Sequence, residues 1–487
     1  MPFTFLMWQE FNSTVRCNVG HICNPQLQTA RIYNNVLNEG PLAMTLSNRN
    51  MRRSINFILI SLLISPLIMA QEPGQVLPAW QAGYLDIHHI NTGHGDAAFY
   101  IFPDGTTMLL DAGEMDPNSE RINSPRNAKL HPNNNKRAYE WIADYIKLFH
   151  PTPSNPILDY ALITHFHDDH FGSYYVGAKQ SPAGDYFLSG ITGVGELLKF
   201  RKLFDRGYPD YNYPHTLKQD SILKKGVQSP DEYKAIVNYW KFTEHHANKY
   251  GMVVEQFKSG SSKQITLQKN AEKFKTFKVQ NIKANGTIWT GKGNETLEYF
   301  PKLSTGLYVP GENQLSLALR IDYGTFRYYT GGDCPGIADL GAPKWNDVET
   351  PMSKAIGEVD VAVMDHHGNR DAHNEFNIKT LRPRVWIQQS WSSDHPGHEV
   401  LRRVTSKYLY PGPRDLFATN MLDANKNVIG PFLEQSYKSM DGHIVVRVMP
   451  GGVTYYVFIL NDENETHEIW SIHGPYESKV KTKEATE

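Results

Sequence analysis

Short runs of hydrophobic residues, many of them alternating with polar ones, recur along the chain from about residue 84 onward. Runs of roughly four to eight residues, bounded by glycine, proline, asparagine or aspartate, are typical of β-strands. By this pattern the sequence predicts strands over residues 84–90, 97–102, 107–110, 157–163, 276–282, 316–322, 325–329, 359–364, 384–387, 443–449 and 452–460. The chain is therefore expected to be rich in β-sheet.

Three segments have the spacing of an amphipathic helix instead. The segment 138–149 presents one apolar face, made by Ala138, Trp141, Ile142, Tyr145 and Phe149. A second helix begins at the Ser-Pro-Asp-Glu sequence of residues 229–232 and ends at Gly251, because serine caps a helix, proline suits its first turn and glycine ends it. A third helix is predicted over 399–408. Strands and helices together predict a mixed α/β protein.

The predicted strand over 157–163 leads into a cluster of three histidines and two aspartates, namely His165, His167, Asp168, Asp169 and His170. Alternation along an extended chain places His165 and His167 on one side, and a tight turn can bring Asp169 and His170 to a second position. Imidazole and carboxylate groups are ligands for zinc, iron or manganese. We interpret this loop as a metal site at the carboxyl end of a strand, where α/β folds place their chemistry.

Four further motifs accompany this H-x-H-x-D-H sequence in a characteristic order. They are G-H-G-D at 93–96, L-L-D-A-G at 109–113, G-G-D at 331–333 and H-H-G at 366–368. The set resembles the metallo-β-lactamase-fold hydrolases, and within them the metallo-β-lactamase-like domain of competence proteins of the ComEC type. The resemblance covers residues from about 84 to 408. It implies an αββα sandwich, here with a helical and β insertion over about 175–308, within a domain that extends from 80 to 478.

The resemblance also implies a metal centre with two divalent ions, zinc above all, with manganese or iron as alternatives. Its implied metal ligands are His165, His167, Asp169, His170, Asp333 and His366. Asp333 would bridge the ions and His366 would close the second site, with His367 as the alternative. Asp169 and His367 are the implied catalytic residues, and Asp111 would brace the metal loop. Such ions lower the pKa of a bound water toward neutrality, so that hydroxide forms without a strong base.

One departure from the family pattern concerns the first metal site, which normally has a third histidine between H-x-H-x-D-H and Asp333. The histidines of that interval are His215, His245 and His246, and Asn313 stands where the ligand is expected. The first site is therefore expected to be incomplete, with these four residues as open alternatives. Two further histidines are open candidates near the centre, namely His94 and His395.

Three classes of function fit these observations. The first is a phosphodiesterase or nuclease acting on a small or polymeric phosphodiester, nucleic acid included. The second is a hydrolase of lactams, amides or other esters, and the third is a binding module without turnover. Residues 258–292 carry eight lysines and a single acid, Glu272, which would attract phosphate. The solvated face of strands explains the same lysines and is the interpretation that we favour.

Composition excludes little. The 487 residues carry a net charge of -2, which indicates neither a polyanionic nor a membrane partner. Three cysteines (Cys17, Cys23 and Cys334) provide no disulfide framework. The sequence carries no signal for the oligomeric state.

The segment Met51–Ala70 has a basic start, a short apolar core and a small residue before a polar stretch, which is typical of a secretory signal peptide. We therefore expect export to the periplasm or beyond, a mature chain beginning near Gln71, and no membrane insertion after cleavage. An uncleaved anchor is the alternative. Residues 1–50 lack periodicity and are expected to be untranslated or disordered. The charged residues 479–487 are expected to be disordered.

Overall fold

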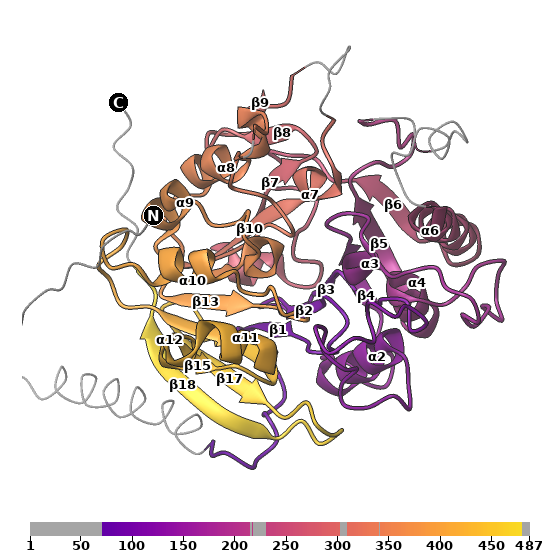
Figure 1. The fold of residues 1–487 in the computed structure, drawn as a ribbon. Helices are drawn as coiled ribbons and strands as arrows, with labels where there is room; N and C mark the ends of the chain where they lie inside the picture. The colour runs from indigo at the N-terminus through magenta and orange to yellow at the C-terminus, as the bar shows by residue number, and fades with distance from the viewer. Residues whose placement is uncertain (1–70, 215–216, 218–229, 302–308, 340, 480–487) are drawn as a thin grey trace, which may run out of the picture. The chain divides into compact units, whose positions relative to one another are not determined.

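The computed structural model describes residues 71–214, 217, 230–301, 309–339 and 341–479, all within one compact unit (Figure 1). The predictions for residues 1–50, for the signal peptide and for the tail beyond Lys479 lie outside the described residues. Among the described residues, no helix is both long and apolar enough to cross a membrane.

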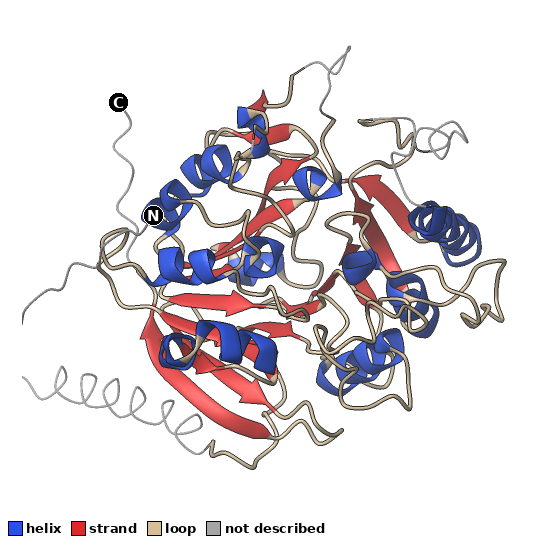
Figure 2. Cartoon of the chain, viewed as in Figure 1, coloured by secondary structure: helices blue, strands red, loops and turns tan. Residues whose placement is uncertain are grey.

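Two mixed sheets of nine strands each form the body of this unit (Figure 2). The first sheet has the strand order β18 (Ile469–Glu477), β17 (Thr454–Leu460), β16 (His443–Val448), β1 (Leu85–His89), β2 (Ala98–Ile101), β3 (Thr107–Leu110), β4 (Leu158–Leu162), β5 (Phe200–Asp205) and β6 (Val253–Gln256). Its strands β3 to β6 pair in parallel, and the remaining pairs are antiparallel.

The second sheet repeats this division into a parallel and an antiparallel half. Its order is β15 (Tyr437–Ser439), β14 (Asp415–Ala418), β13 (Val385–Gln388), β12 (Val361–Val363), β11 (Phe326–Thr330), β10 (Ala318–Tyr323), β7 (Phe277–Ala284), β8 (Thr287–Trp289) and β9 (Thr296–Glu298). Strands β11 to β15 are parallel, and β7 to β11 pair antiparallel.

Alternation along the strands divides their side chains between two cores. In β2, Tyr100 packs in a core that also contains Ile321 and Tyr328 of the second sheet, so the two sheets share one apolar layer. Its neighbours Phe99 and Ile101 belong to a different core on the other side of the first sheet. This is the period of two expected when both faces of a sheet are buried.

Helices supply the apolar surface for the outer side of each sheet. The core outside the first sheet includes residues of α2 (Ala138–Phe149), α4 (Gly190–Leu197) and α6 (Pro230–Tyr250). The core outside the second includes residues of α8 (Glu349–Ile356), α9 (Glu375–Leu381), α10 (His398–Thr405) and α12 (Pro431–Ser436), the last of which follows α11 (Asp423–Ile429). The short elements are α3 (Asp168–Phe171), α7 (Glu312–Leu315), η1 (Ala271–Phe274), η2 (Lys344–Asn346) and η3 (Asp365–Gly368).

The mixed α/β class predicted from the sequence is confirmed, and most predicted elements are present. The helix predicted over 138–149 is α2, and Gly251, with a φ of 70°, follows α6 as expected of a helix terminator. The segment 175–308, expected as an insertion, is integrated into the fold. It adds β5 and β6 to the first sheet and β7 to β9 to the second. Helices α4 and α6 precede β5 and β6, as crossover connections between parallel strands require.

Candidate metal centre

The loops that follow the parallel strands bring the predicted ligands together. Residues 165–170 follow β4, and Asp333 follows β11. His366 and His367 lie in η3, directly after β12. The carboxyl ends of strands from both sheets thus meet at one place, which explains how residues almost 200 positions apart in sequence become neighbours.

Four buried residues, Asp169, His170, Asp333 and His367, form what we call the Asp169 group. His170 Nε2 lies 3.0 Å from Asp333 Oδ1. His367 Nε2 lies 3.1 Å from Asp169 Oδ2 and 3.5 Å from Asp333 Oδ1. The sequence favoured His366 for this position, but the structure places His367 here.

A second set, the His165 group, consists of His165, His167 and the same Asp333. His165 Nε2 is 3.1 Å from His167 Nδ1 and 3.7 Å from Asp333 Oδ2. His366 stands beside this group, with its Nε2 atom 3.7 Å from Asp333 Oδ2 and 3.1 Å from the side-chain amide of Asn313. Asp333 therefore presents one oxygen to each group.

The hydrogen bonds at the far side of the rings determine which nitrogen faces the centre. His170 Nδ1 lies 2.8 Å from Asp111 Oδ2, and His366 Nδ1 lies 2.5 Å from Asp371 Oδ1. His367 Nδ1 lies 3.1 Å from the main-chain oxygen of Gln389. These oxygens accept hydrogen bonds, so Nδ1 carries a proton in each ring and Nε2 is the atom whose lone pair a second proton or a metal would take.

Those lone pairs point at carboxylate oxygens, and this arrangement tests whether the residues fit a metal. His170 Nε2 and Asp333 Oδ1 are both buried and have no hydrogen-bond partner among the described residues. Burial lowers the pKa of His170, but Asp333 and Asp169 outweigh it and hold that pKa well above its usual value. The negative charge of these carboxylates is therefore stabilised by positive charge at the cluster, which protons or a cation can supply. These buried groups of histidine and aspartate could hold a metal ion.

Asp111 braces the metal loop from behind. Its two oxygens accept hydrogen bonds from the main-chain nitrogen and the hydroxyl of Thr164, both at 2.7 Å. Since that hydroxyl donates to Asp111, it is free to accept from His165 Nδ1 at 3.1 Å. One buried carboxylate therefore orients both His165 and His170, the outer-shell arrangement that tunes metal sites.

Backbone strain accompanies the ligands after β11 and β12. His366 and His367 have φ angles of 48° and 55°, a region that side chains rarely adopt. Hydrogen bonds hold the strained turn, from the His366 nitrogen to Gly332 O at 2.9 Å and from Gln388 Nε2 to His367 O at 2.7 Å. Gly332 itself has a φ of 56°, and a Cβ there would lie 2.9 Å from Thr164 Cβ. Glycine at this position of the G-G-D motif is therefore favoured, because a side chain would be strained and would contact Thr164 too closely.

A cavity of about 330 Å³ opens onto the centre. Its lining includes His167, Asp168, Asp169, Asn313, Asp333, His366 and His367, together with Arg121, Arg126, Asn127, Glu232, Asn369, Trp391, Ser392, Asp394 and His395. Burial raises the pKa of Asp168 to about 6, and the positive charge of Arg121, which lines the same cavity, opposes part of this rise. The cavity is strongly polar, and both arginines belong to it.

Two residues of the cavity touch the ligands directly. Trp391 Nε1 donates a hydrogen bond to Asp169 Oδ2 at 3.1 Å. The ring of His395 stacks on His367 with the centroids 4.6 Å apart, and its Nδ1 atom is buried without a hydrogen-bond partner among the described residues. His395 thus lies at the centre, as the sequence allowed, whereas no sequence signal pointed to Trp391.

The described histidines among the candidates for the first site, His245 and His246, lie elsewhere. His245 and His246 are on α6, where His246 is 2.8 Å from the Tyr186 hydroxyl and packs on Phe242. His94 is buried in its turn but does not line the cavity. His215 lies outside the described residues. Asp96, in the same G-H-G-D motif, is the residue that reaches the centre, with Oδ1 3.1 Å from His367 Nδ1.

None of the lysines of residues 258–292 is among the described residues that line the cavity. Phe277, next to Lys278, pairs with Tyr323 at the far end of β10, while the metal centre lies beyond the other end at Ala318. Five residue steps along a strand separate these ends by roughly 17 Å. Seven of the eight lysines are exposed, which agrees with their interpretation as a solvated face, whereas Lys283 is buried and pairs with Ala318.

A third buried set, Glu349, Asp365 and His373, lies behind the centre. Both oxygens of Glu349 accept main-chain hydrogen bonds, from the nitrogens of His373 at 2.6 Å and Asn374 at 2.9 Å. Asp365 accepts from the Tyr329 hydroxyl at 3.0 Å, and burial raises its pKa to about 8. We interpret this set as a support for η3, because Asp365 begins that turn.

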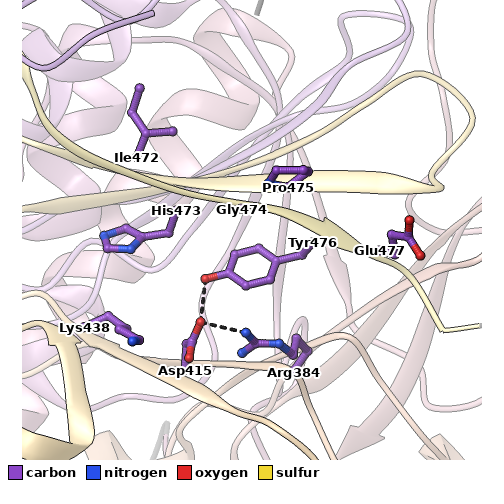
Figure 3. A pocket seen from close by; sticks show the side chains of 9 residues that line it. All are labelled: Arg384, Asp415, Lys438, Ile472, His473, Gly474, Pro475, Tyr476 and Glu477. Atoms are coloured by element: carbon purple, nitrogen blue, oxygen red, sulfur yellow. Dashed lines mark hydrogen bonds and ion pairs between the residues drawn. The ribbon is translucent and has the colours of Figure 1, made fainter. Parts of the chain in front are cut away.

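A separate cavity of about 480 Å³ lies at the opposite ends of β13 and β14, beside β18 (Figure 3). Asp415 accepts from the Tyr476 hydroxyl at 2.8 Å and pairs with Arg384 at 2.9 Å, as the dashed lines show. The central charges of this second cavity are thus paired with one another, and we assign the cavity no part in the metal centre.

Comparison with known proteins gives no relative: no protein-family model matches the chain, and no curated protein matches it. The function is therefore argued from the chemistry of the metal centre and its cavity.

Proposed function

We propose that this protein is a metal-dependent hydrolase of phosphodiesters, with the αββα arrangement of the metallo-β-lactamase fold. The observation that carries the proposal is the position of Asp333, which presents Oδ1 to the Asp169 group and Oδ2 to the His165 group. A shared carboxylate between two sets of imidazoles is the donor set of a two-ion site. Zinc suits these ligands best, with manganese or iron as alternatives.

The Asp169 group would hold one ion, and His165, His167 and Asp333 would hold the other. His366 is positioned to complete the second set, because its Nε2 atom lies 3.7 Å from Asp333 Oδ2, the oxygen that His165 Nε2 also approaches at 3.7 Å. This supports His366 as the third ligand of that set, and it weakens the main reason to consider a binding module without turnover. His367, proposed from the sequence as catalytic, is better assigned as a ligand.

When bound, the ions would lower the pKa of a water molecule and polarise a phosphoryl oxygen. In the hydrolysis of the phosphodiester, the water oxygen bonds to phosphorus as the ester P–O bond breaks. One water proton ends on the leaving oxygen, and the other stays on the phosphomonoester or passes to solvent. Asp169, held by Trp391 and His367, keeps its carboxylate oriented toward the cavity. His395, whose ring stacks on His367, contributes to the wall of the cavity.

The cavity supports a phosphodiester better than a lactam. Beyond the ligands its lining is polar apart from Trp391: Arg121 and Arg126 are its cations, Asp168, Glu232 and Asp394 are its carboxylates, and the other side chains bear amide, hydroxyl or imidazole groups. Trp391 supplies the one large apolar surface among the described lining residues. Guanidinium groups suit the oxygens of phosphate through paired hydrogen bonds. A neutral lactam would offer no negative charge to Arg121, which makes no ion pair with the described residues.

The test is hydrolysis by the purified protein after chelation and reloading with zinc, manganese or iron. We expect turnover of bis-p-nitrophenyl phosphate and little or none of nitrocefin. Metal content measured by mass spectrometry would accompany each assay. Rapid nitrocefin turnover with no phosphodiester cleavage under any of these metals would overturn the substrate class. Bound metal with neither activity would favour a binding module.

A further inference from the structure

A loop of residues 121–128, which we call the Arg loop, forms one wall of the cavity. It is attached to the segment that carries Trp391 by two main-chain hydrogen bonds, from Ala128 N to Trp391 O at 2.8 Å and from Ser393 N to Arg126 O at 2.7 Å. Asn127 and Ser392 form a bridge between the same segments. The wall is therefore joined to the residue that holds Asp169.

The turn within this loop fixes the position of Arg121. Its carbonyl oxygen accepts from Asn127 Nδ2 at 2.6 Å and from Ser124 Oγ at 2.7 Å. The side chains of Arg121, Arg126 and Asn127 all line the cavity. Two cations and an amide donor are thus presented together beside the metal centre, on a backbone held by hydrogen bonds.

The two guanidinium groups differ in how they are engaged. Arg126 pairs with Asp394 at 3.3 Å, in a partly exposed ion pair whose side chains are 53% and 34% exposed. Such pairs contribute little free energy, so a bound anion can compete for the arginine. Arg121 makes no ion pair with the described residues, although its charge reaches Asp168. Glu232, on α6, is a carboxylate of the same lining and disfavours an anion on its own side.

We propose that Arg121 and Arg126 form a subsite for a second phosphate of the substrate, one unit away from the phosphodiester that is cleaved. This rests on the proposed function and specifies its substrate class as nucleotides that carry a further phosphate, either terminal or within a chain. The guanidinium pair would bind the second phosphate while the scissile one lies at the metal centre. The indole of Trp391, which lines the same cavity and bonds to Asp169, would offer its surface to the nucleoside.

The experiment compares four substrates that differ in charge and size: bis-p-nitrophenyl phosphate, the dinucleotide TpT, TpT with a 5′-phosphate and TpT with a 3′-phosphate. We expect kcat/KM for one phosphorylated dinucleotide to exceed that for TpT by about tenfold or more. In the double variant Arg121→Gln/Arg126→Gln this preference should disappear, mainly through KM, so that kcat/KM for the phosphorylated dinucleotide falls to that for TpT in the same variant. The position of the preferred phosphate gives the direction in which the substrate lies.

Arg201→Gln is the matched control, since Arg201 is a 65% exposed arginine on β5 that does not line the cavity. A second readout is the affinity for thymidine 3′,5′-bisphosphate against thymidine 5′-monophosphate, measured by calorimetry. Cleavage of bis-p-nitrophenyl phosphate with no preference for the added phosphate, or a preference that survives in the double variant, would overturn the subsite alone. Failure to cleave any phosphodiester would overturn the proposed function. The calorimetric comparison then decides the subsite independently, because equal affinity for the two nucleotides would overturn it.

Discussion

His367 Nδ1 lies 3.1 Å from the main-chain oxygen of Gln389, the residue directly after β13. A carbonyl oxygen can only accept, so this contact assigns the proton to Nδ1 and turns Nε2 toward Asp169. The orientation of a central ligand is thereby set by the backbone of a neighbouring strand. Asp96 Oδ1, also 3.1 Å from this nitrogen, adds a negative charge on the same side.

Because Asp333 belongs to both groups, its removal should weaken metal binding at both of them. We predict that Asp333→Ala lowers metal content at the two groups together and turnover by orders of magnitude. The fold should persist, since this side chain bridges ligands at the ends of the strands instead of packing a core. Metal analysis, phosphodiester assays and circular dichroism would measure the three effects. Asp423→Ala, at a side chain that is 92% exposed, is the control, and full activity in Asp333→Ala would refute the assignment.

Replacing Asp111 with asparagine tests the bracing role without touching a ligand. The amide nitrogen of asparagine would face either His170 Nδ1 and the Thr164 hydroxyl, which share Oδ2, or the Thr164 main-chain nitrogen, which donates to Oδ1. In the first case His170 would carry its proton on Nε2, toward Asp333, and block a metal, and in the second two donors would oppose each other behind the metal loop. We predict metal affinity about 10- to 100-fold weaker, measured by competition with a chelating indicator. Glu272→Gln, at a 90% exposed side chain, should bind metal like the native chain. Unchanged affinity in Asp111→Asn would contradict the role.

Lys283 is a fully buried lysine that joins β7 to the segment bearing Asn313. Its ammonium donates to the carbonyl oxygens of Gln314 at 2.6 Å and Ser316 at 2.8 Å. Lys283→Met would leave these oxygens without that donor, so the free energy of unfolding should fall by roughly 2–3 kcal/mol. Denaturant titration of the metal-free protein measures this. Lys278→Met, at an exposed position of the same strand, should have a much smaller effect, and a Lys283→Met variant as stable as native would refute the prediction.

The stability of the metal-free protein should fall in mild acid, partly because of His246. Burial and the charge of Lys199 lower the pKa of this histidine from 6.5 to about 3. His246 therefore binds a proton below about pH 6.5 in the unfolded chain, but only below about pH 3 in the folded chain. This contribution to stability is complete above pH 6.5 and is lost as pH falls, by at most about 1.4 kcal/mol per pH unit.

Denaturant titrations at pH 7.5 and pH 5.5 would measure that loss, with a chelator present to exclude metal release. His246→Gln can keep a hydrogen bond to Tyr186 and should lose stability less steeply between these pH values than the native protein. His398→Gln, at an exposed histidine, should follow the native protein. An unchanged slope in His246→Gln would show that other groups cause the loss.

The local pieces of this protein were predictable because their causes are local. Alternation of side chains indicated β1, β4 and β10, and the spacing of apolar residues indicated α2, since both patterns follow from backbone geometry. Short edge strands such as β6, β9 and β15 were missed because they contain few residues and have weak alternation. The density of histidine and aspartate after β4 was enough to suggest a metal, because few other environments need that composition.

The arrangement of the centre was decided only by the tertiary structure. His366 and His367 are adjacent in sequence and chemically alike, so no local pattern could tell which one joins Asp169. The left-handed turn at these residues sends His367 toward the first sheet and His366 toward Asn313. The partners Asp96, Trp391 and the Gln389 carbonyl come from other strands and loops, and they become neighbours only when the sheet ends meet. Contacts between residues this distant in sequence depend on how the sheets pack, which the alternation of side chains along a single strand does not encode.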